Sequence, residues 1–432
     1  MTAEIAVLNK SAVALAADSA VTISNGNGNT KIYNGAEKLF ALTKYHPVGI
    51  MVYGSGSLCR VPWELVIKEY RKRLGKSSFS TLDAYTEDFF KFLEQEEHLI
   101  PRDLRDHFLI NHWISIYSDI WDGVREKAEV YVEQNDAVPP DDVTYEFLNN
   151  ICDNFIDLLE RENFLQEFSQ TDVDELAVQT GDFVNSQLTE QNIDQDSVPN
   201  HIKSKIAVLL ALATAKENPL GSNSGVVFAG YGDQEFFPSV LTFNLKGFWG
   251  QKLRRAPNPQ KSAGGGESGI EAYAQDEEAL TFMRGISPAI QSHYTNIYFD
   301  AMDKIIKKAF EIIDKNDDDL KREKEKSELL EAASQEWSQA NSVVNQIIQN
   351  DYVDQVVNMV EFLPKDELAY MAESLVNMTA FKRKVTNDSE TVGGPIDVAV
   401  ISKGDGFVWI KRKHYFESSL NSHYFEKFSK GQ

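Results

Sequence analysis

The sequence has few cysteines, few basic residues and no long apolar run. Only two of its 432 residues are cysteines, Cys59 and Cys152, which are too few for a disulfide framework or a thiolate metal site. This fits a reducing compartment. Lysine and arginine number 43 against 66 aspartates and glutamates, so the formal charge is −23. Because a nucleic-acid backbone is bound by a basic face, this excess argues against nucleic acid as the main partner.

The sequence also lacks the marks of a membrane protein, an exported protein or a metalloprotein. No stretch approaches about eighteen consecutive apolar residues, so no transmembrane helix or membrane partner is expected. Glu4 and Lys10 interrupt the apolar start, which has no basic leader, and we interpret it as part of the fold rather than a signal peptide. His107 and His112 do not share a helix face well, so we interpret them as structural. We therefore expect a cytoplasmic protein without a metal or other cofactor.

Apolar residues at 42% and aromatic residues at 11% allow a sizeable core. Alternating apolar residues and the turn signal Asn9-Lys10-Ser11 predict a hairpin over 2–18, and two more buried strands are expected at 38–43 and 47–53. Further strands are expected at 225–231 and 239–249, and a hairpin closes the pattern at 395–412.

Helical spacing of apolar residues dominates two long stretches, from 57 to about 216 and from 270 to about 388. Basic residues gather at Arg71–Arg73 and at Lys252, Arg254 and Arg255, and a solvated face accounts for them on this acidic chain.

The residue after the initiator methionine carries the clearest chemistry. Thr2 is small, so we expect Met1 to be removed, which would leave a threonine with a hydroxyl and a free α-amine. An α-amine with a pKa near about 8 accepts a proton at neutral pH, so one residue would supply both nucleophile and base. A lysine ammonium held by a carboxylate would stabilise the reactive form, and backbone N–H groups would receive the oxyanion.

The opening segment T-A-E-I-A-V-L-N-K-S-A-V-A-L-A-A-D resembles that of proteasome β-subunits and their bacterial relatives, which are N-terminal nucleophile hydrolases. Thr2 and Asp18 are sixteen positions apart, as in that family, and E-K-L-F-A-L…I-M-V-Y-G-S-G is similar to its lysine-bearing strand pair. The segment V-G-G-P-I-D-V-A-V-I-S resembles the family's closing hairpin. The resemblance covers under half of the chain.

The resemblance implies four roles. Thr2 is the nucleophile, Lys38 lowers the pKa of its hydroxyl, Asp18 fixes Lys38, and the N–H of Gly54 helps to hold the oxyanion. Lys31 competes with Lys38. Supporting residues near the Thr2 amine are sought at Asp388, Ser389 and Glu390, and in the glycine-rich loop at Ser268. Val21, Ala36, Phe40 and Val52 would line an apolar substrate pocket and favour apolar side chains at the cleaved residue; alternatively they are plain core residues.

The resemblance implies an α+β fold, a four-layer αββα sandwich built from residues 1–75, 200–289 and 386–432. Helical insertions would occupy 76–199 and 290–385, as a cap, as an assembly surface or as plain bulk. The function expected is a threonine-type peptidase that acts on peptides or proteins, assembles as a homo-oligomer and works with a dedicated partner such as an ATPase unfoldase. Two alternatives stay open: a catalytically silent scaffold or binding protein of the same fold, and a non-proteolytic amidase.

Overall fold

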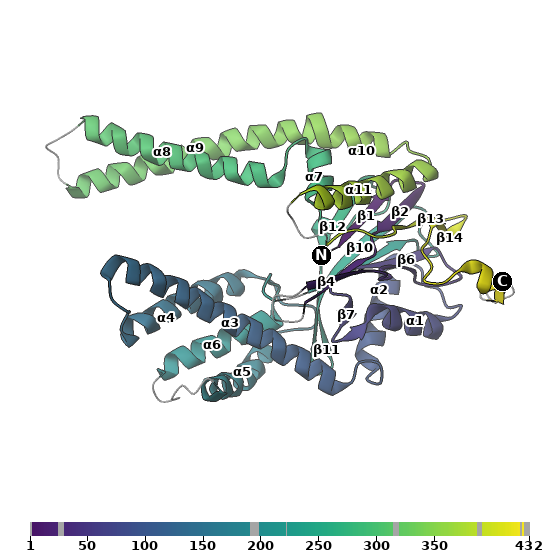
Figure 1. Ribbon diagram of the computed structural model, residues 1–432, viewed down its shortest axis with the longest axis horizontal. Coiled ribbons are helices and arrows are strands. Elements are labelled where there is room, and N and C mark those ends of the chain that lie inside the picture. Colours follow the sequence, from purple (N-terminus) through teal and green to yellow (C-terminus); the bar gives the residue numbers. More distant parts are fainter. Residues whose placement is uncertain are drawn as a thin grey trace. The chain divides into compact units, whose positions relative to one another are not determined.

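The computed structural model describes residues 2–24, 30–190, 198–221, 223–313, 319–386, 391–423 and 426. The chain forms two compact units (Figure 1). Unit 1 comprises Met1–Leu39, Phe236–Ser239 and Ala263–Gln432, and unit 2 comprises Phe40–Glu235 and Val240–Ser262. Each unit holds most of one five-stranded sheet together with helices, so the predicted α+β class is confirmed. The four-layer arrangement and the predicted domain boundaries stay predictions.

The sheet of unit 1 has the strand order β12-β1-β2-β13-β14. The predicted hairpin over 2–18 is confirmed as β1 (Ala3–Leu8) paired antiparallel with β2 (Ala12–Ala17). The predicted closing hairpin is β13 (Asp397–Ser402) paired with β14 (Gly406–Lys411). Because β13 also pairs with β2, two segments almost 400 positions apart lie side by side, Asp397 opposite Ala17. Every residue of β1, β2 and β13 is buried.

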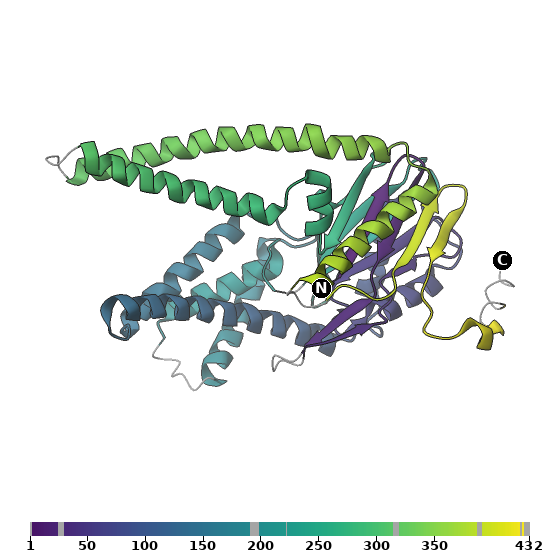
Figure 2. The same ribbon diagram turned by 45° about the horizontal axis from the view of Figure 1, so that its top comes forward.

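One helix, α11 (Lys365–Val385), packs against β1, β2 and β13 of this sheet (Figure 2). Three alanines of β2, at positions 12, 14 and 16, belong to the apolar cluster that joins sheet and helix. Their small side chains let the helix approach the middle of the sheet closely. Ala3, Ile5 and Val7 of β1 belong to the same cluster. Since side chains alternate along a strand, the intervening Glu4 must point to the opposite face.

Residues 270–274 differ from the expectation. We expected helix from residue 270, but Gly269–Ala274 form β12, paired antiparallel with β1. Ile270 and Ala272 both enter the cluster under α11, and this two-residue period is that of a strand. The prediction of helix there was wrong because the segment is too short to show a clear period of its own. The helical spacing of the residues that follow it was therefore extended to it.

The remaining elements of unit 1 are a two-stranded ribbon and a series of helices. The ribbon pairs β3 (Ala20–Ser24) with β4 (Thr30–Asn34), and it was not predicted. Helices α8 and α9 run side by side (Figure 2). The helices are α7 (Glu277–Arg284), α8 (Pro288–Ile313), α9 (Asp319–Ile348), a π-helical turn (Gln349–Val353), α10 (Asp354–Val360) and, after α11 and the last hairpin, a 3-10 turn (Ser418–Leu420).

The second sheet has the strand order β11-β10-β9-β6-β5. Four of its strands were predicted: β5 (Leu39–Ala41), β6 (Val48–Gly54), β9 (Ser224–Gly230) and β10 (Ser239–Trp249). The fifth, β11 (Lys252–Pro257), was not. Two short strands, β7 (Ser57–Leu58) and β8 (Val61–Pro62), and a 3-10 turn (Pro259–Lys261) complete the extended segments. An aromatic cluster of Phe89, Phe90, Phe228 and Phe243 joins this sheet to a helix of the same unit.

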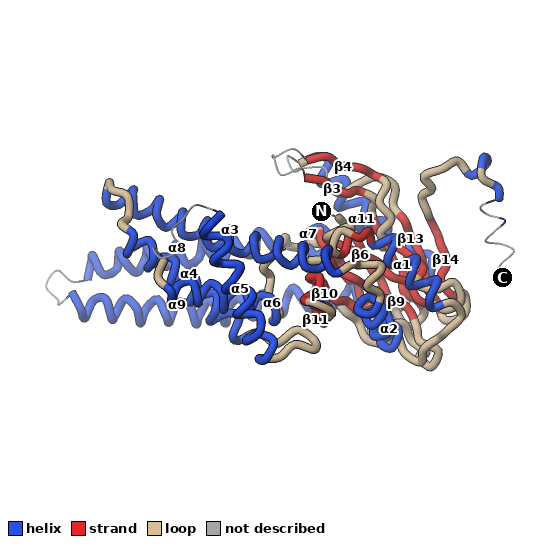
Figure 3. The backbone as a smooth tube through the Cα atoms, turned by 90° about the horizontal axis from the view of Figure 1, so that it is seen from below, coloured by secondary structure: helices blue, strands red, loops and turns tan. Residues whose placement is uncertain are grey.

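The helices of unit 2 fall into two groups (Figure 3). The first group, α1 and α2, shares a core with the sheet. The second group has its own core, in which α6 is buried along most of its length and packs against α3, α4 and α5. The bounds are α1 (Trp63–Leu74), α2 (Leu82–Gln95), α3 (Arg102–Asn135), α4 (Asp141–Arg161), α5 (Gln170–Glu190) and α6 (Asn200–Ala215). Within the described ranges, no helix is both long and apolar enough to cross a membrane.

Two arginines of the basic group near 252–255 are buried, so the interpretation of that group as a solvated face was wrong. The Arg254 guanidinium donates to His112 Nε2 at 3.0 Å and to the carbonyl oxygens of Thr214 and Lys246, both at 2.9 Å. Burial beside this arginine lowers the pKa of His112 to about 2, so its ring is a neutral acceptor. The N–H groups on both terminal nitrogens of Arg255 donate hydrogen bonds to the Glu87 carboxylate, at 3.1 and 3.0 Å. These side chains link β11 to the helices and are structural.

Candidate active site

Thr2 lies immediately before β1, at the end of the ladder that joins β1 to β12. Its carbonyl oxygen accepts a hydrogen bond from the N–H of Gln275 at 3.0 Å, which continues the ladder beyond the pair Ala3–Ala274. The Thr2 side chain is 5% exposed, and its hydroxyl donates to Glu4 Oε2 at 2.9 Å. Thr2 and Glu4 therefore face the same side of the strand, away from α11.

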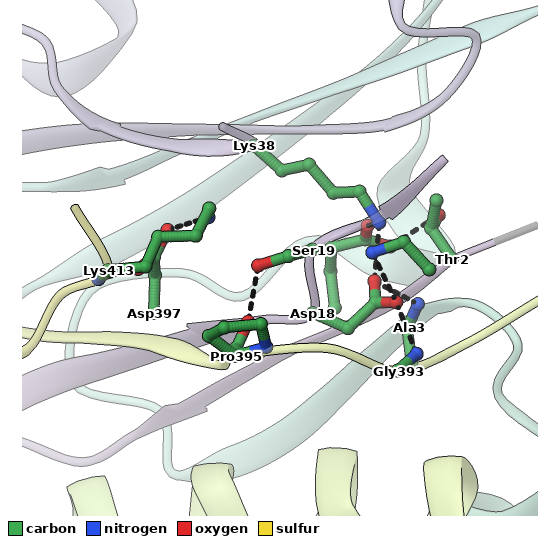
Figure 4. Close-up of polar contacts among 11 residues, drawn as sticks. Thr2, Ala3, Asp18, Ser19, Lys38, Gly393, Pro395, Asp397 and Lys413 are labelled. Atoms are coloured by element: carbon green, nitrogen blue, oxygen red, sulfur yellow. Dashed lines mark hydrogen bonds and ion pairs between the residues drawn. The ribbon is translucent and has the colours of Figure 1, made fainter. Parts of the chain in front are cut away.

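Asp18 is the centre of the site (Figure 4). Its buried carboxylate accepts hydrogen bonds from three backbone N–H groups: those of Ala3 at 3.1 Å, Ala20 at 3.2 Å and Gly393 at 2.9 Å. The Lys38 ammonium donates to the same carboxylate. Four hydrogen-bond donors therefore converge on this one buried side chain. Asp18 thus fixes the start of β1, the start of β3, the segment before β13 and the lysine.

Lys38 lies between two buried carboxylates. Besides its contact with Asp18, its Nζ is 3.5 Å from Glu4 Oε1, and the lysine is only 5% exposed. Lys31, the competing lysine, is exposed on β4. The structure thus brings Thr2, Asp18 and Lys38 together, and it adds Glu4.

Sequence analysis missed Glu4 as a site residue, because there it counted only as an interruption of an apolar run. The signal was available: Glu4 is two positions from Thr2 on a strand, so both side chains share a face. It is fully buried, and desolvation raises its pKa from about 4.5 to about 8. Lys38 opposes this rise, and Asp18 adds to it. A buried carboxyl with a raised pKa beside a hydroxyl makes Glu4 a candidate site residue.

This raised pKa makes the stability of the protein depend on pH. Below pH 4.5 the carboxyl is protonated in both the folded and the unfolded chain. As pH rises to 8 the unfolded chain releases the proton and the folded chain keeps it, so stability is lost over this window. Between pH 5 and pH 8 the wild type should lose roughly 3 kcal/mol in free energy of unfolding through Glu4, since a tenfold difference in proton affinity is worth about 1.4 kcal/mol. Glu4→Gln does not titrate at this position, so we expect it not to show this loss.

Urea unfolding of both proteins at the two pH values measures this loss. Glu64→Gln is the matched control, because the Glu64 side chain is 50% exposed in α1. Equal pH dependence in wild type and Glu4→Gln would show that Glu4 titrates normally.

The predicted glycine pair before the last hairpin has a structural reason. The N–H of Gly393 binds Asp18, and its carbonyl oxygen accepts from the N–H of Ser19 at 3.1 Å. Gly394 has a positive φ of 76°, and a Cβ there would lie 2.7 Å from the Cβ of Asn34. Figure 4 also shows Ser19 bonded to the Pro395 carbonyl and an ion pair between Asp397 and Lys413. The proposed supporting residues Asp388, Ser389 and Glu390 lie outside the described residues.

Ser268 is not brought to Thr2. It precedes β12, whose first residue, Gly269, pairs with Leu8 at the far end of β1. Strands rise about 3.3 Å per residue, so roughly 20 Å separates the two ends of this ladder. The prediction that Ser268 supports the Thr2 amine therefore fails, because the glycine-rich loop leads into β12 at the opposite end.

The other predicted site residues divide between the units. Gly54 ends β6 opposite Ser224, with a φ of 78°, and a Cβ there would lie 2.8 Å from the Asn223 carbonyl oxygen. In unit 2, Phe40 and Val52 belong to the apolar core. Val21 and Ala36 of unit 1 are half-buried. Their pocket and the oxyanion role of Gly54 stay predictions.

Comparison with known proteins gives one kind of match. No protein-family model matches the chain, and no curated protein matches it. Solved structures do match it. In structure the chain is similar to Anbu (ancestral beta-subunit) from Yersinia bercovieri, with 11% sequence identity over 99% of this chain and 95% of that one, at a TM-score of 0.27.

Proposed function

We propose that this chain is an N-terminal threonine hydrolase that cleaves amide bonds, with peptides as the substrate class. The proposal rests on the chain's own residues. One observation carries it: the Thr2 hydroxyl forms one cluster with three buried ionisable side chains, Glu4, Asp18 and Lys38, at the start of β1. Burying three ionisable side chains beside a hydroxyl costs stability, and catalysis explains why the cluster is there.

The reaction follows from the chemistry of these groups. The Thr2 oxygen bonds to the amide carbon while its proton passes to the free α-amine, and a backbone N–H group stabilises the oxyanion, a role that the sequence resemblance gives to Gly54. When the C–N bond breaks, the proton goes to the leaving amine and an ester remains on Thr2. Water then hydrolyses the ester and frees the threonine.

Lys38 contributes a fixed positive charge near the hydroxyl, which favours the negative charge that develops on the Thr2 oxygen. Asp18 keeps Lys38 in place, because its carboxylate is itself held by three backbone N–H groups. The pocket of Val21, Ala36, Phe40 and Val52, assembly into a homo-oligomer and a dedicated ATPase unfoldase belong to the proposal through the sequence resemblance alone. Cytoplasmic location belongs to it through composition.

Covalent labelling tests the function directly. A peptide β-lactone with an apolar side chain acylates a reactive threonine by ring opening, so the protein should gain one probe mass. Peptide mapping is expected to find the acyl group on Thr2, in molecules whose N-terminal residue is Thr2. Labelling at another residue, or none on a chain that begins with Thr2, would overturn the proposal. The control is the same protein with Met1 retained, in which Thr2 has no free amine.

A further inference from the structure

The Thr2 hydroxyl already has a bonded proton acceptor within the chain. It donates to Glu4 Oε2 at 2.9 Å, and the carboxyl that accepts this bond is fully buried. A proton moves between groups that share such a hydrogen bond without any rearrangement of the side chains. The hydroxyl proton therefore has a direct path to Glu4.

The surroundings of Glu4 balance its two protonation states. Its other oxygen, Oε1, accepts no hydrogen bond among the described residues and has the Lys38 Nζ at 3.5 Å. Lys38 and Asp18 are the charged groups that act on Glu4, and Ala17 and Tyr273 are its neighbours across the two ladders. Burial and Asp18 favour the neutral acid, and Lys38 favours the carboxylate. With a pKa of about 8, Glu4 gains and loses a proton near neutral pH, as a general base must.

We infer that Glu4 is a catalytic residue that takes the proton of the Thr2 hydroxyl and returns it to the leaving group. This rests on the proposed function. As the Thr2 oxygen bonds to the carbonyl carbon, its proton forms a bond to Glu4 Oε2 and the carbonyl electron pair moves to oxygen. When the C–N bond breaks, the Glu4 acid gives the proton to the leaving nitrogen. In this scheme the single hydroxyl proton goes to Glu4 Oε2 rather than to the α-amine.

Lys38 has a second role in this scheme. When Glu4 accepts the proton, the carboxyl becomes neutral and the negative charge moves to the substrate oxygen. The bond to the Asp18 carboxylate keeps the Lys38 ammonium beside the reacting groups. The transfer therefore relocates a single negative charge, from Glu4 to the substrate oxygen, which limits its electrostatic cost.

Two variants separate proton transfer from simple orientation of the hydroxyl. The Glu4→Gln amide oxygen still accepts the Thr2 hydrogen bond but does not take a proton, and Glu4→Ala does neither. We expect the rate of Thr2 acylation by the peptide β-lactone, followed by intact mass at pH 8, to fall about a hundredfold in both variants. Urea unfolding at pH 8 must show that Glu4→Gln is folded, so that a slow rate is not caused by unfolding.

The remaining outcomes are decisive. A Glu4→Gln rate close to that of wild type, with a slow Glu4→Ala, means that Glu4 only orients the hydroxyl and overturns the inference, as do wild-type rates in both. Glu64→Gln is the control and should react at the wild-type rate. The proposed function is judged separately by Thr2→Ala: if that variant is acylated like wild type, the nucleophile lies elsewhere, whereas an inert Thr2→Ala with a fast Glu4→Gln refutes only the role of Glu4.

Discussion

Thr2→Ala is expected to abolish both acylation by the peptide β-lactone and turnover of fluorogenic peptide amides. The substitution removes the oxygen that forms the bond to the substrate, and Glu4, Asp18 and Lys38, the side chains linked to it by hydrogen bonds and ion pairs, have no hydroxyl to replace it. In serine hydrolases the loss of the nucleophile costs on the order of 10⁶ in kcat. The strand itself should persist, because β1 is held by ladders on both sides.

Thr22→Ala is a matched control for this substitution. Thr22 lies on β3 of the same unit, and its buried hydroxyl has no hydrogen-bond partner among the described residues. Its loss should leave labelling and turnover unchanged. Thr2→Ser provides the converse test, since it keeps a hydroxyl next to the amine and should keep the label. Full turnover in Thr2→Ala would move the chemistry to another part of the chain.

Lys38→Met is expected to slow acylation of Thr2 by about a hundredfold or more. The substitution keeps much of the volume of the side chain and removes the ammonium that pairs with both Asp18 and Glu4. Since Lys38 lowers the pKa of Glu4, its removal should raise that pKa further and leave less carboxylate to accept a proton. The rate constant for labelling between pH 6 and 9 measures both effects.

Lys31→Met is the control for this prediction, because Lys31 is the competing lysine and is exposed on β4. It should react like wild type. Removing one partner of a buried ion pair is destabilising, so far-UV circular dichroism must show that Lys38→Met is folded. Lys38→Arg keeps the charge and should retain more activity than Lys38→Met. A wild-type rate in Lys38→Met together with a slow Lys31→Met would reverse the assignment of the two lysines.

The parts of the fold with strong local patterns could be predicted from the sequence. The hairpin of β1 and β2 has alternating apolar residues around a polar turn, and the closing hairpin has a Lys-Gly-Asp-Gly turn between two apolar runs. The juxtaposition of Thr2, Asp18 and Lys38 came from the family resemblance, and the structure supplies its physical basis. Asp18 accepts bonds from both the first strand and the lysine, so it places them together.

What sequence analysis missed depended on long-range pairing. The strand β12 is a six-residue segment at the edge of a sheet, and its partner lies more than 250 positions away. Without that pairing, the sequence does not show how far Ser268 lies from Thr2. We expected Arg254 to be solvated because arginine is usually exposed. The carbonyl groups that accept its hydrogen bonds come from α6 and β10, which lie far from it in the sequence or in another element.

Glu4 shows a different limit. Its burial was not evident, since a charged residue near a chain start is ordinary. Only the contacts with Thr2 and Lys38 give it a role. Alternation along the strand predicted which face it occupies, but not that this face is closed to water.

The hydrogen bond between the Gly393 N–H and Asp18 joins residues 375 positions apart. During translation the ribosome adds this donor 375 residues after Asp18. Until then the Asp18 carboxylate lacks one of its three backbone donors, and β2 lacks its neighbour β13. A nascent or truncated chain therefore carries the threonine without the completed cluster around it. If the proposed function holds, a chain that ends before Gly393 should not be acylated at Thr2.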